Sequence, residues 1–279
     1  METYVFAAVL LAALLHAGWN SVVKVGLDRF STILLLALVQ AVIALPILPF
    51  VEKPALASWG FILAAALLHT GYKLFLIRAY AFSDLSQAYP LARGTAPLIV
   101  TLVSITCLGV VLSPAALVAI AVISAGILLM TLKGASARKM DRRAVFYALG
   151  TAGFTASYTL VDGTGARIAG TASGFILAMV IVDALMMAVV AFLLKGRHAF
   201  SAVLPAWRTG IAAGAMSLGA YWIAVWAFTV APIALVAALR ETSILFATLI
   251  AAFILNEEVN RWRWLSALLI AAGVVVMKV

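Results

Sequence analysis

The stretch ARGTAPLIVTL at residues 92–102 decides the fold, because it recurs without gaps as LRETSILFATL at residues 239–249. Under the same shift of 147 residues, ISAGILLM at 123–130 lies over IAAGVVVM at 270–277. Matching leucines are common in apolar sequence. A match of Arg93 with Arg240 inside two apolar runs is uncommon, since arginine is costly in hydrocarbon. We therefore infer that the chain consists of two related halves.

The composition of the 279 residues excludes a water-soluble globule. Apolar residues (AVILMFWYC) make up 66%, charged residues make up 10% and the mean hydropathy is +1.18. Soluble domains are about half apolar and about a quarter charged. The apolar excess must face the hydrocarbon of a bilayer. The net charge of +9 is better explained as an orientation signal than as a nucleic-acid interface, and we expect no nucleic-acid binding.

Apolar runs of about 20 residues, separated by prolines, glycines and charges, predict ten membrane-spanning helices in an all-α integral membrane protein. The basic stretch from Lys133 to Arg143 divides the chain into a first repeat (1–133), a connecting loop (134–143) and a second repeat (144–279). Because five crossings are an odd number, the second repeat enters the membrane from the other side, which predicts a 5+5 inverted repeat. The expected helices are 3–23, 31–51, 57–79, 86–110, 114–132, 144–162, 172–194, 209–230, 233–255 and 262–278.

Lysine and arginine are distributed unequally between the two ends of these helices. The end with both termini carries Lys53, Arg167 and Lys278, whereas the other end carries thirteen basic residues. The positive-inside rule therefore predicts cytoplasmic basic loops and external termini. We expect the protein in the plasma (inner) membrane of a bacterium.

Polar residues inside the first span form one stripe. His16, Asn20 and Lys24 follow at i, i+4 spacing, and Trp19 lies on an adjacent strip. This stripe is either a cavity wall, with Trp19 and Asn20 touching a ligand, or a set of interhelical hydrogen bonds beside a Lys24 that reaches the membrane surface.

The third span places His69, Tyr72 and Lys73 on one face. A lysine within the membrane needs a negative partner. The partner of Lys73 is either a carboxylate of this chain, Glu241 or Asp183, or an anionic group of a substrate.

The two matched segments supply the densest polar groups. Tyr89 and Arg93 share a face of the fourth span, in which two prolines free backbone carbonyls, and Arg240 is followed by Glu241 in the ninth. A guanidinium suits carboxylate, phosphate or phosphonate groups. Each arginine either contacts substrate or holds the structure together through helix ends or Glu241.

Two aromatic residues, Tyr158 and Trp222, are further candidates for a cavity wall, although aromatic side chains in spans more often pack or mark the interface. Glu241 and His16 are the candidate proton carriers. Glycines spaced four apart at 170/174 and 210/214 predict close helix packing.

Several segments resemble a known family. LSQAYPLARGTAPLIV with the later SAGILL, and ALRETSILFATLIAAFILNEEVNRWRWLSALLIAAGVVVM, are similar to the two EamA-type repeats of the drug/metabolite transporter superfamily. HAGWNSVVK and YPLARG are similar to a subgroup associated with phosphonate use. The resemblance implies ten helices, a central cavity and transport of small metabolites, often export of amino acids. Family members are expected to have cytoplasmic termini, which the charge count contradicts. Glu257 corresponds to Val110 in the first half, so we give it no shared role.

The sequence thus predicts a secondary transporter that moves a small polar metabolite by alternating access. The expected substrate is an amino acid or a related zwitterion or anion such as an organophosphonate. The expected partners are this substrate, the bilayer and a coupling proton, with no cofactor and no metal, in a monomer or homodimer. The alternatives are an exporter of lipophilic cations or drugs, which would use Glu241 and the aromatics, and an intramembrane enzyme. HExxH and GxSxG motifs and paired intramembrane aspartates are missing from the sequence, which disfavours the enzyme.

Overall fold

A computed structural model describes residues 1–22, 27–82, 85–133 and 140–278, and these residues form helices and connecting segments without a strand. Lys24 and most of the predicted connecting loop 134–143 lie outside the described residues. The long helices are α1 (Thr3–Val22), α2 (Arg29–Ile47), α3 (Trp59–Phe82), α4 (Leu85–Thr106), α5 (Pro114–Lys133), α6 (Arg142–Ala169), α7 (Ala172–Lys195), α9 (Trp207–Val230) and α12 (Arg261–Lys278). The shorter ones are α8 (His198–Ser201), α10 (Ile233–Arg240), α11 (Ser243–Leu249), η1 (Leu48–Phe50), η2 (Leu56–Ser58), η3 (Leu204–Ala206) and η4 (Ile250–Ile254).

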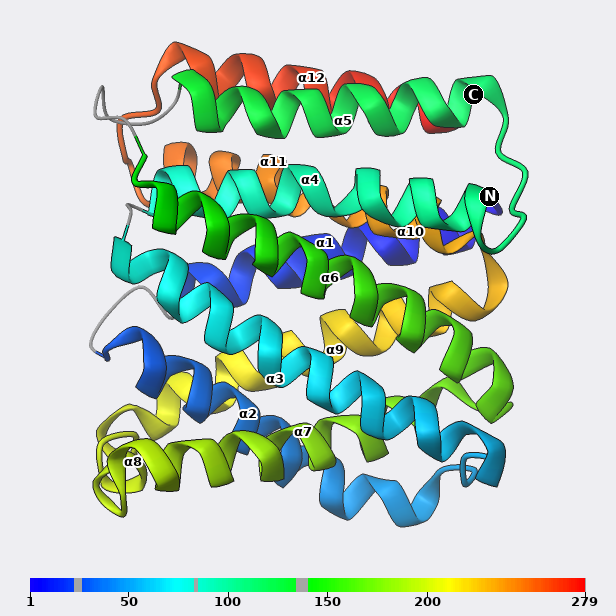
Figure 1. Cartoon of the computed structure of the whole chain (residues 1–279). Helices are drawn as coiled ribbons and strands as arrows, with labels where there is room; N and C mark the ends of the chain where they lie inside the picture. The colour runs from blue at the N-terminus through cyan, green and yellow to red at the C-terminus, as the bar shows by residue number, and fades with distance from the viewer. Residues whose placement is uncertain (23–26, 83–84, 134–139, 279) are drawn as a thin grey trace.

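The long helices lie side by side in one bundle, with α5 and α12 along one edge and α2 and α7 along the other (Figure 1). The N-terminus and the C-terminus lie at the same end of the bundle (Figure 1). Nine helical stretches in the described part of the chain are long and apolar enough to cross a membrane. The fold is therefore that of an all-α integral membrane protein.

The tenth predicted span, α12, is not among these nine. Its 18 residues include three basic ones, Arg261, Arg263 and Lys278. All three lie near the helix ends, where long basic side chains reach the membrane surface. The apolar middle of α12 packs along α5, so α12 completes the bundle.

The sixth span is longer than the predicted 144–162. Helix α6 continues to Ala169 and ends at Gly170, which adopts the left-handed conformation (φ 71°). The prediction stopped before Gly163 and Gly165, because glycine disfavours helix interiors. In the structure these glycines allow close packing: a Cβ atom at Gly163 would lie 2.5 Å from the Ile233 side chain.

The ninth span, Ile233–Ile254, agrees with the predicted 233–255 but changes its hydrogen-bond pattern after Arg240. Helix α10 ends at Arg240, and α11 begins at Ser243. Between them Glu241 and Thr242 donate backbone hydrogen bonds to the carbonyls three residues earlier, which tightens the turn.

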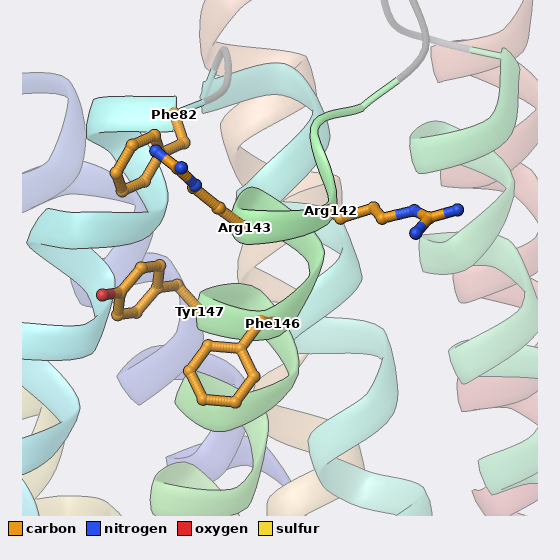
Figure 2. A pocket seen from close by; sticks show the side chains of 5 residues that line it. All are labelled: Phe82, Arg142, Arg143, Phe146 and Tyr147. Atoms are coloured by element: carbon orange, nitrogen blue, oxygen red, sulfur yellow. The ribbon is translucent and has the colours of Figure 1, made fainter.

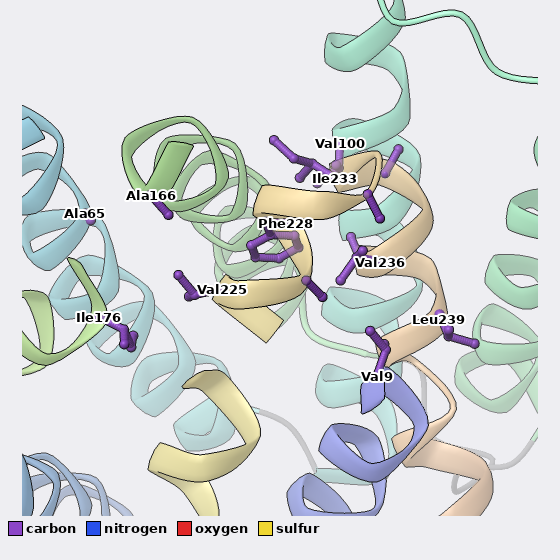
Figure 3. Packing of buried hydrophobic residues seen from close by; sticks show 14 of the residues in the cluster. Val9, Ala65, Val100, Ala166, Ile176, Val225, Phe228, Ile233, Val236 and Leu239 are labelled. Atoms are coloured by element: carbon purple, nitrogen blue, oxygen red, sulfur yellow. The ribbon is translucent and has the colours of Figure 1, made fainter. Parts of the chain in front are cut away.

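The largest buried apolar cluster lies toward the end of the bundle that carries the termini. It includes Val9 near the start of α1, Val100 near the end of α4, Phe228 near the end of α9 and Ile233 at the start of α10 (Figure 3). Toward the opposite end, α3, α4 and α6 share a small cluster of three alanines, and a further apolar cluster that includes Phe30 and Met187 packs α2 against α7. The cluster at the end with the termini is therefore the larger one, and it joins α1, α4, α9 and α10.

Three of the four glycines predicted to pack closely do so, and the fourth has another role. Gly210 and Gly214 of α9 pack against Leu35 and Val39 of α2. Gly174 of α7 approaches a backbone carbonyl oxygen so closely that a Cβ atom there would lie 2.3 Å from it. Gly170 instead ends α6, as described above.

Candidate functional site

A buried ion pair joins the two halves of the chain. Arg93 Nε on α4 lies 2.9 Å from Glu241 Oε2 between α10 and α11, and the two residues are only 6% and 4% exposed. The N–H of Arg93 does not point at that oxygen, so the contact is an ion pair without a well-formed hydrogen bond. Arg93 Nη2 donates a hydrogen bond to Ser243 Oγ at 3.3 Å. Of the partners that the sequence allows for Arg93, a substrate, helix-end carbonyls or Glu241, this structure contains Glu241.

Arg240 has a different environment from Arg93. Its guanidinium carbon lies 4.9 Å from the centre of the Tyr221 ring, a cation–π contact. Among the described residues no carboxylate forms an ion pair with Arg240. The half-buried Arg240 therefore leaves a cation available inside the bundle.

The stripe on α1 faces α4. The hydroxyl of Tyr89 lies 3.5 Å from His16 Nε2, and Arg93 lies over the Tyr89 ring at 5.8 Å. The edge of Trp19 meets His16 at 5.2 Å between ring centres, and the buried Trp19 Nε1 has no hydrogen-bond partner within the described ranges. Asn20 donates its side-chain amide to the backbone carbonyl of His16 at 2.8 Å. The structure thus brings His16, Trp19 and Tyr89 close to Arg93, while Asn20 bonds within its own helix.

Aromatic rings from α3, α6 and α9 form a second cluster. Tyr158 stacks on His69 with 4.0 Å between ring centres, and Tyr72 meets Tyr158 edge-on at 5.6 Å. Tyr221 lies edge-on to both His69 and Tyr158. It also donates its hydroxyl to Asp162 Oδ2. Its polar tip is therefore used inside the protein.

Lys73 pairs with Asp183 rather than with Glu241. Its Nζ donates to Asp183 Oδ2, and Thr70 Oγ1 donates to Asp183 Oδ1 at 3.1 Å. Asp183 is 3% exposed. This pair joins α3 to α7.

Trp222 lies in a packing position. Its Nε1 donates to Ser173 Oγ at 2.9 Å, which links α9 to the start of α7. The sequence left Trp222 as a candidate for a cavity wall or for packing, and in the structure it packs against the apolar cluster toward the end with the termini.

A hollow of about 440 Å³ lies at the basic end of the bundle, between the end of α3 and the start of α6. Figure 2 shows its lining: Arg143 extends toward Phe82, whereas Arg142 points away from Phe82, and Phe146 and Tyr147 complete the wall. None of the predicted site residues lines it. We therefore place the candidate site on the buried polar network and not in this open hollow.

Sequence reasoning gave too little weight to Asp162 and Ser243. Asp162 was expected near the end of a helix, but α6 extends beyond it, and its side chain is completely buried. A carboxylate within an apolar run was the signal that pointed to it. Ser243 follows Glu241 by two residues, and the tightened turn brings it to Arg93.

Comparisons with known proteins agree with this architecture. The model of the EamA-like transporter family matches residues 142–279. One solved crystal structure of a protein superposes on this chain with a TM-score of 0.72 and 17% sequence identity. The match covers 99% of this chain and 96% of the other. At this identity the likeness shows the fold alone. The search of curated proteins finds no match.

The fold and the polar interior are those of an integral membrane protein. The chain belongs to the EamA-type members of the drug/metabolite transporter superfamily, and it is thus a membrane transporter of this general type.

Proposed function

We propose that this transporter moves a small anionic or zwitterionic metabolite, such as an amino acid or an organophosphonate, by alternating access at a site between its halves. The observation that carries the proposal is the half-buried Arg240, which has no ion-pair partner in the described part of the chain and lies beside the buried pair of Arg93 and Glu241. An isolated cation inside a membrane protein needs a counter-charge, and a carboxylate or phosphonate group supplies one.

The halves, residues 1–133 and 144–279 joined by 134–143, act in this proposal as inverted repeats. Each helix of the first half has a counterpart in the second: α1 and α6, α2 and α7, α3 and α9, α4 and α10–α11, α5 and α12. When each helix is replaced by its counterpart, the principal helix–helix contacts correspond to one another. The α3–α6 contact becomes α9–α1, α4–α6 becomes α10–α11 with α1, and α2–α9 becomes α7–α3. This exchange supports an approximate twofold axis between the halves.

The substrate site proposed here contains Arg93, Arg240 and Glu241, with His16 and Tyr89 beside them. An anionic group binds Arg240 and competes with Glu241 for Arg93. The remaining wall residues of the proposed site are Trp19, Tyr72 and Tyr158, whereas Asn20 bonds within α1, Trp222 bonds to Ser173 and Lys73 pairs with Asp183.

Alternating access requires the bundle to open at one end at a time. The large apolar cluster supports a state closed at the end with the termini, and we propose access from the basic end. By the positive-inside rule, the basic end is cytoplasmic in the proposed orientation. A proton is the proposed coupling ion, and Glu241 and His16 are the groups of the substrate site that can carry it. The protein family consists of transporters, and we propose no enzymatic activity.

Transport into liposomes tests this function. Purified protein is reconstituted and offered a panel of labelled amino acids and organophosphonates, with and without a pH gradient. The proposal expects uptake of a member of this panel above that of empty liposomes. Uptake of lipophilic cationic dyes, inhibited by other cations but not by zwitterions, would contradict it and favour the drug exporter.

A further inference from the structure

A second buried polar cluster lies apart from the Arg93–Glu241 pair and joins α3, α6 and α9. Asp162 is completely buried, and one carboxylate oxygen, Oδ2, contacts both His69 Nε2, at 2.8 Å, and the hydroxyl of Tyr221. The other oxygen, Oδ1, is also buried and has no hydrogen-bond partner among the described residues. The charge of this carboxylate is thus only partly compensated, which is costly in a low-dielectric interior.

A proton removes that imbalance. When His69 is neutral, its Nε2–H donates to Asp162 and the cluster carries the charge of the carboxylate. A proton added at the other ring nitrogen makes an imidazolium–carboxylate pair with no net charge, which is favoured away from water. Histidine is the side chain suited to this change near physiological pH. The His69 side chain keeps 12% of its surface exposed and Asp162 none, so the imidazole is the accessible member.

The surrounding groups connect this cluster to the proposed substrate site. Tyr158 stacks on His69, and the ring of Tyr221 separates the cluster from Arg240, which lies over its face. The positive charge of Arg240 opposes a further proton nearby, and an anion bound to Arg240 removes that opposition. Other titratable or charged side chains on the helices packed around the cluster include His16, Tyr72, Lys73, Tyr89, Arg93, Asp183 and Glu241. Lys73 pairs with Asp183, and Arg93 pairs with Glu241.

We propose that His69 and Asp162 form a proton-binding site of this transporter, separate from Glu241 and His16, with Tyr221 as a positioning residue for the carboxylate. Its role in coupling rests on the proposed function. Because coupling between two sites is reciprocal, the proton and the anionic substrate favour each other's binding and are carried in the same direction.

Nuclear magnetic resonance of ¹⁵N-histidine tests the site directly. The chain has three histidines, so His16→Gln, His69→Gln and His198→Gln variants assign every signal in lipid nanodiscs. As the pH falls from about 8 to about 5, where histidine changes charge, we expect the His69 ring to gain its second proton. In Asp162→Asn, which leaves no orphaned charge, we expect His69 to stay neutral over the same range.

The matched control removes a different buried carboxylate near His69. Asp183 pairs with Lys73, one turn from His69 on α3, and the double variant Lys73→Gln/Asp183→Asn deletes that pair without stranding a charge. We expect His69 to titrate in this variant as in the wild type. A His69 that never gains the proton, or that titrates unchanged in Asp162→Asn, would overturn the proposal.

Flux measurements test the coupling separately. With a transported member of the amino-acid and organophosphonate panel, Asp162→Asn should retain exchange across the membrane and lose the acceleration by a pH gradient. Acceleration equal to that of the wild type would overturn the coupling role. If no panel compound is transported, the proposed substrate class fails, and the histidine spectra still decide whether the proton site exists.

Discussion

Arg93 and Arg240 occupy corresponding positions in the two halves of the sequence but have different partners in the structure. Arg93 pairs with Glu241 across the halves, whereas Arg240 lies over the Tyr221 ring. The position that corresponds to Glu241 in the first half is Gly94, which carries no charge. The repeat therefore supplies two cations and one carboxylate, and this inequality makes one guanidinium available to an anionic substrate.

The Arg93–Glu241 pair predicts a strongly unequal response to single and double substitutions. Arg93→Gln leaves the buried Glu241 carboxylate without its partner, which should cost about 3–5 kcal/mol of stability. Arg93→Gln/Glu241→Gln leaves no such charge and should unfold at a higher temperature than Arg93→Gln alone. Thermal unfolding in detergent, followed by circular dichroism, measures both. A double variant less stable than the single would contradict the assigned contact.

Gly174 should tolerate no side chain. A Cβ atom there would lie 2.3 Å from the backbone oxygen of Glu52, which cannot move aside as a side chain can. Gly174→Ala should therefore destabilise the protein by about 1–3 kcal/mol. The matched control is Gly153→Ala in α6, where a Cβ atom meets no atom within 4 Å. This variant should be neutral or more stable, by up to about 1 kcal/mol, because alanine favours helices. Equal melting temperatures for the two variants would refute the predicted close contact.

The native cysteine reports the orientation. Cys107 is exposed and follows α4 at the end of the bundle that carries the termini. The charge distribution predicts that this end is external. A membrane-impermeant maleimide should label Cys107 in intact cells, whereas a Ser201→Cys/Cys107→Ala variant, exposed at the opposite end, should react only after lysis. The reverse labelling would show that the termini are cytoplasmic, as expected from the resemblance to the superfamily.

Asp28 should make the start of α2 sensitive to acid. It accepts the backbone N–H groups of Phe30 and Ser31 as N-cap and lies 3.4 Å from Lys195. Partial burial raises the pKa of this carboxyl, but hydrogen bonds from Ser31 and the charge of Lys195 outweigh it and lower the pKa below its ordinary value. A lowered pKa in the folded state means that the charged carboxylate stabilises the fold above the ordinary pKa of aspartate. This stabilisation is lost as the pH falls through the lowered value.

Two substitutions separate the cap from the charge. Asp28→Ala should cost about 1 kcal/mol at neutral pH through loss of the cap. Asp28→Asn keeps a good N-cap and should remove mainly the acid dependence. Melting temperatures measured from neutral to acid pH check both, and an Asp28→Asn variant that keeps the acid dependence of the wild type would contradict the assignment.

The membrane-spanning helices were predictable from sequence because hydropathy alone requires them. The sequence also indicated an ion pair for Lys73 and the polar positions of the site. It did not reveal that Lys73 pairs with Asp183 and not with Glu241, since this pairing depends on how α3, α7 and α10 are rotated and packed. Nor did it reveal the tightened turn after Arg240 within this otherwise continuous span.

Asp162 illustrates the remaining limit. Two nearby glycines suggested the end of a helix, whereas packing against Ile233 and Phe175 keeps α6 intact through both. Because the predicted helix stopped at Asp162, the carboxylate was expected at a helix end, and its pairing with His69 was not predicted. At this position tertiary packing outweighs the low helix propensity of glycine.

The central claim is that an anionic substrate binds the two arginines between the halves. It is tested most directly by substrate affinity and flux in liposomes for Arg93→Gln and Arg240→Gln, with the surface variant Arg208→Gln as the control for lost charge. Only variants that purify as folded protein are compared. The account predicts that both interior variants lose transport of the compound that the wild type carries, while Arg208→Gln keeps it. Unchanged affinity and flux in both interior variants would contradict the claim.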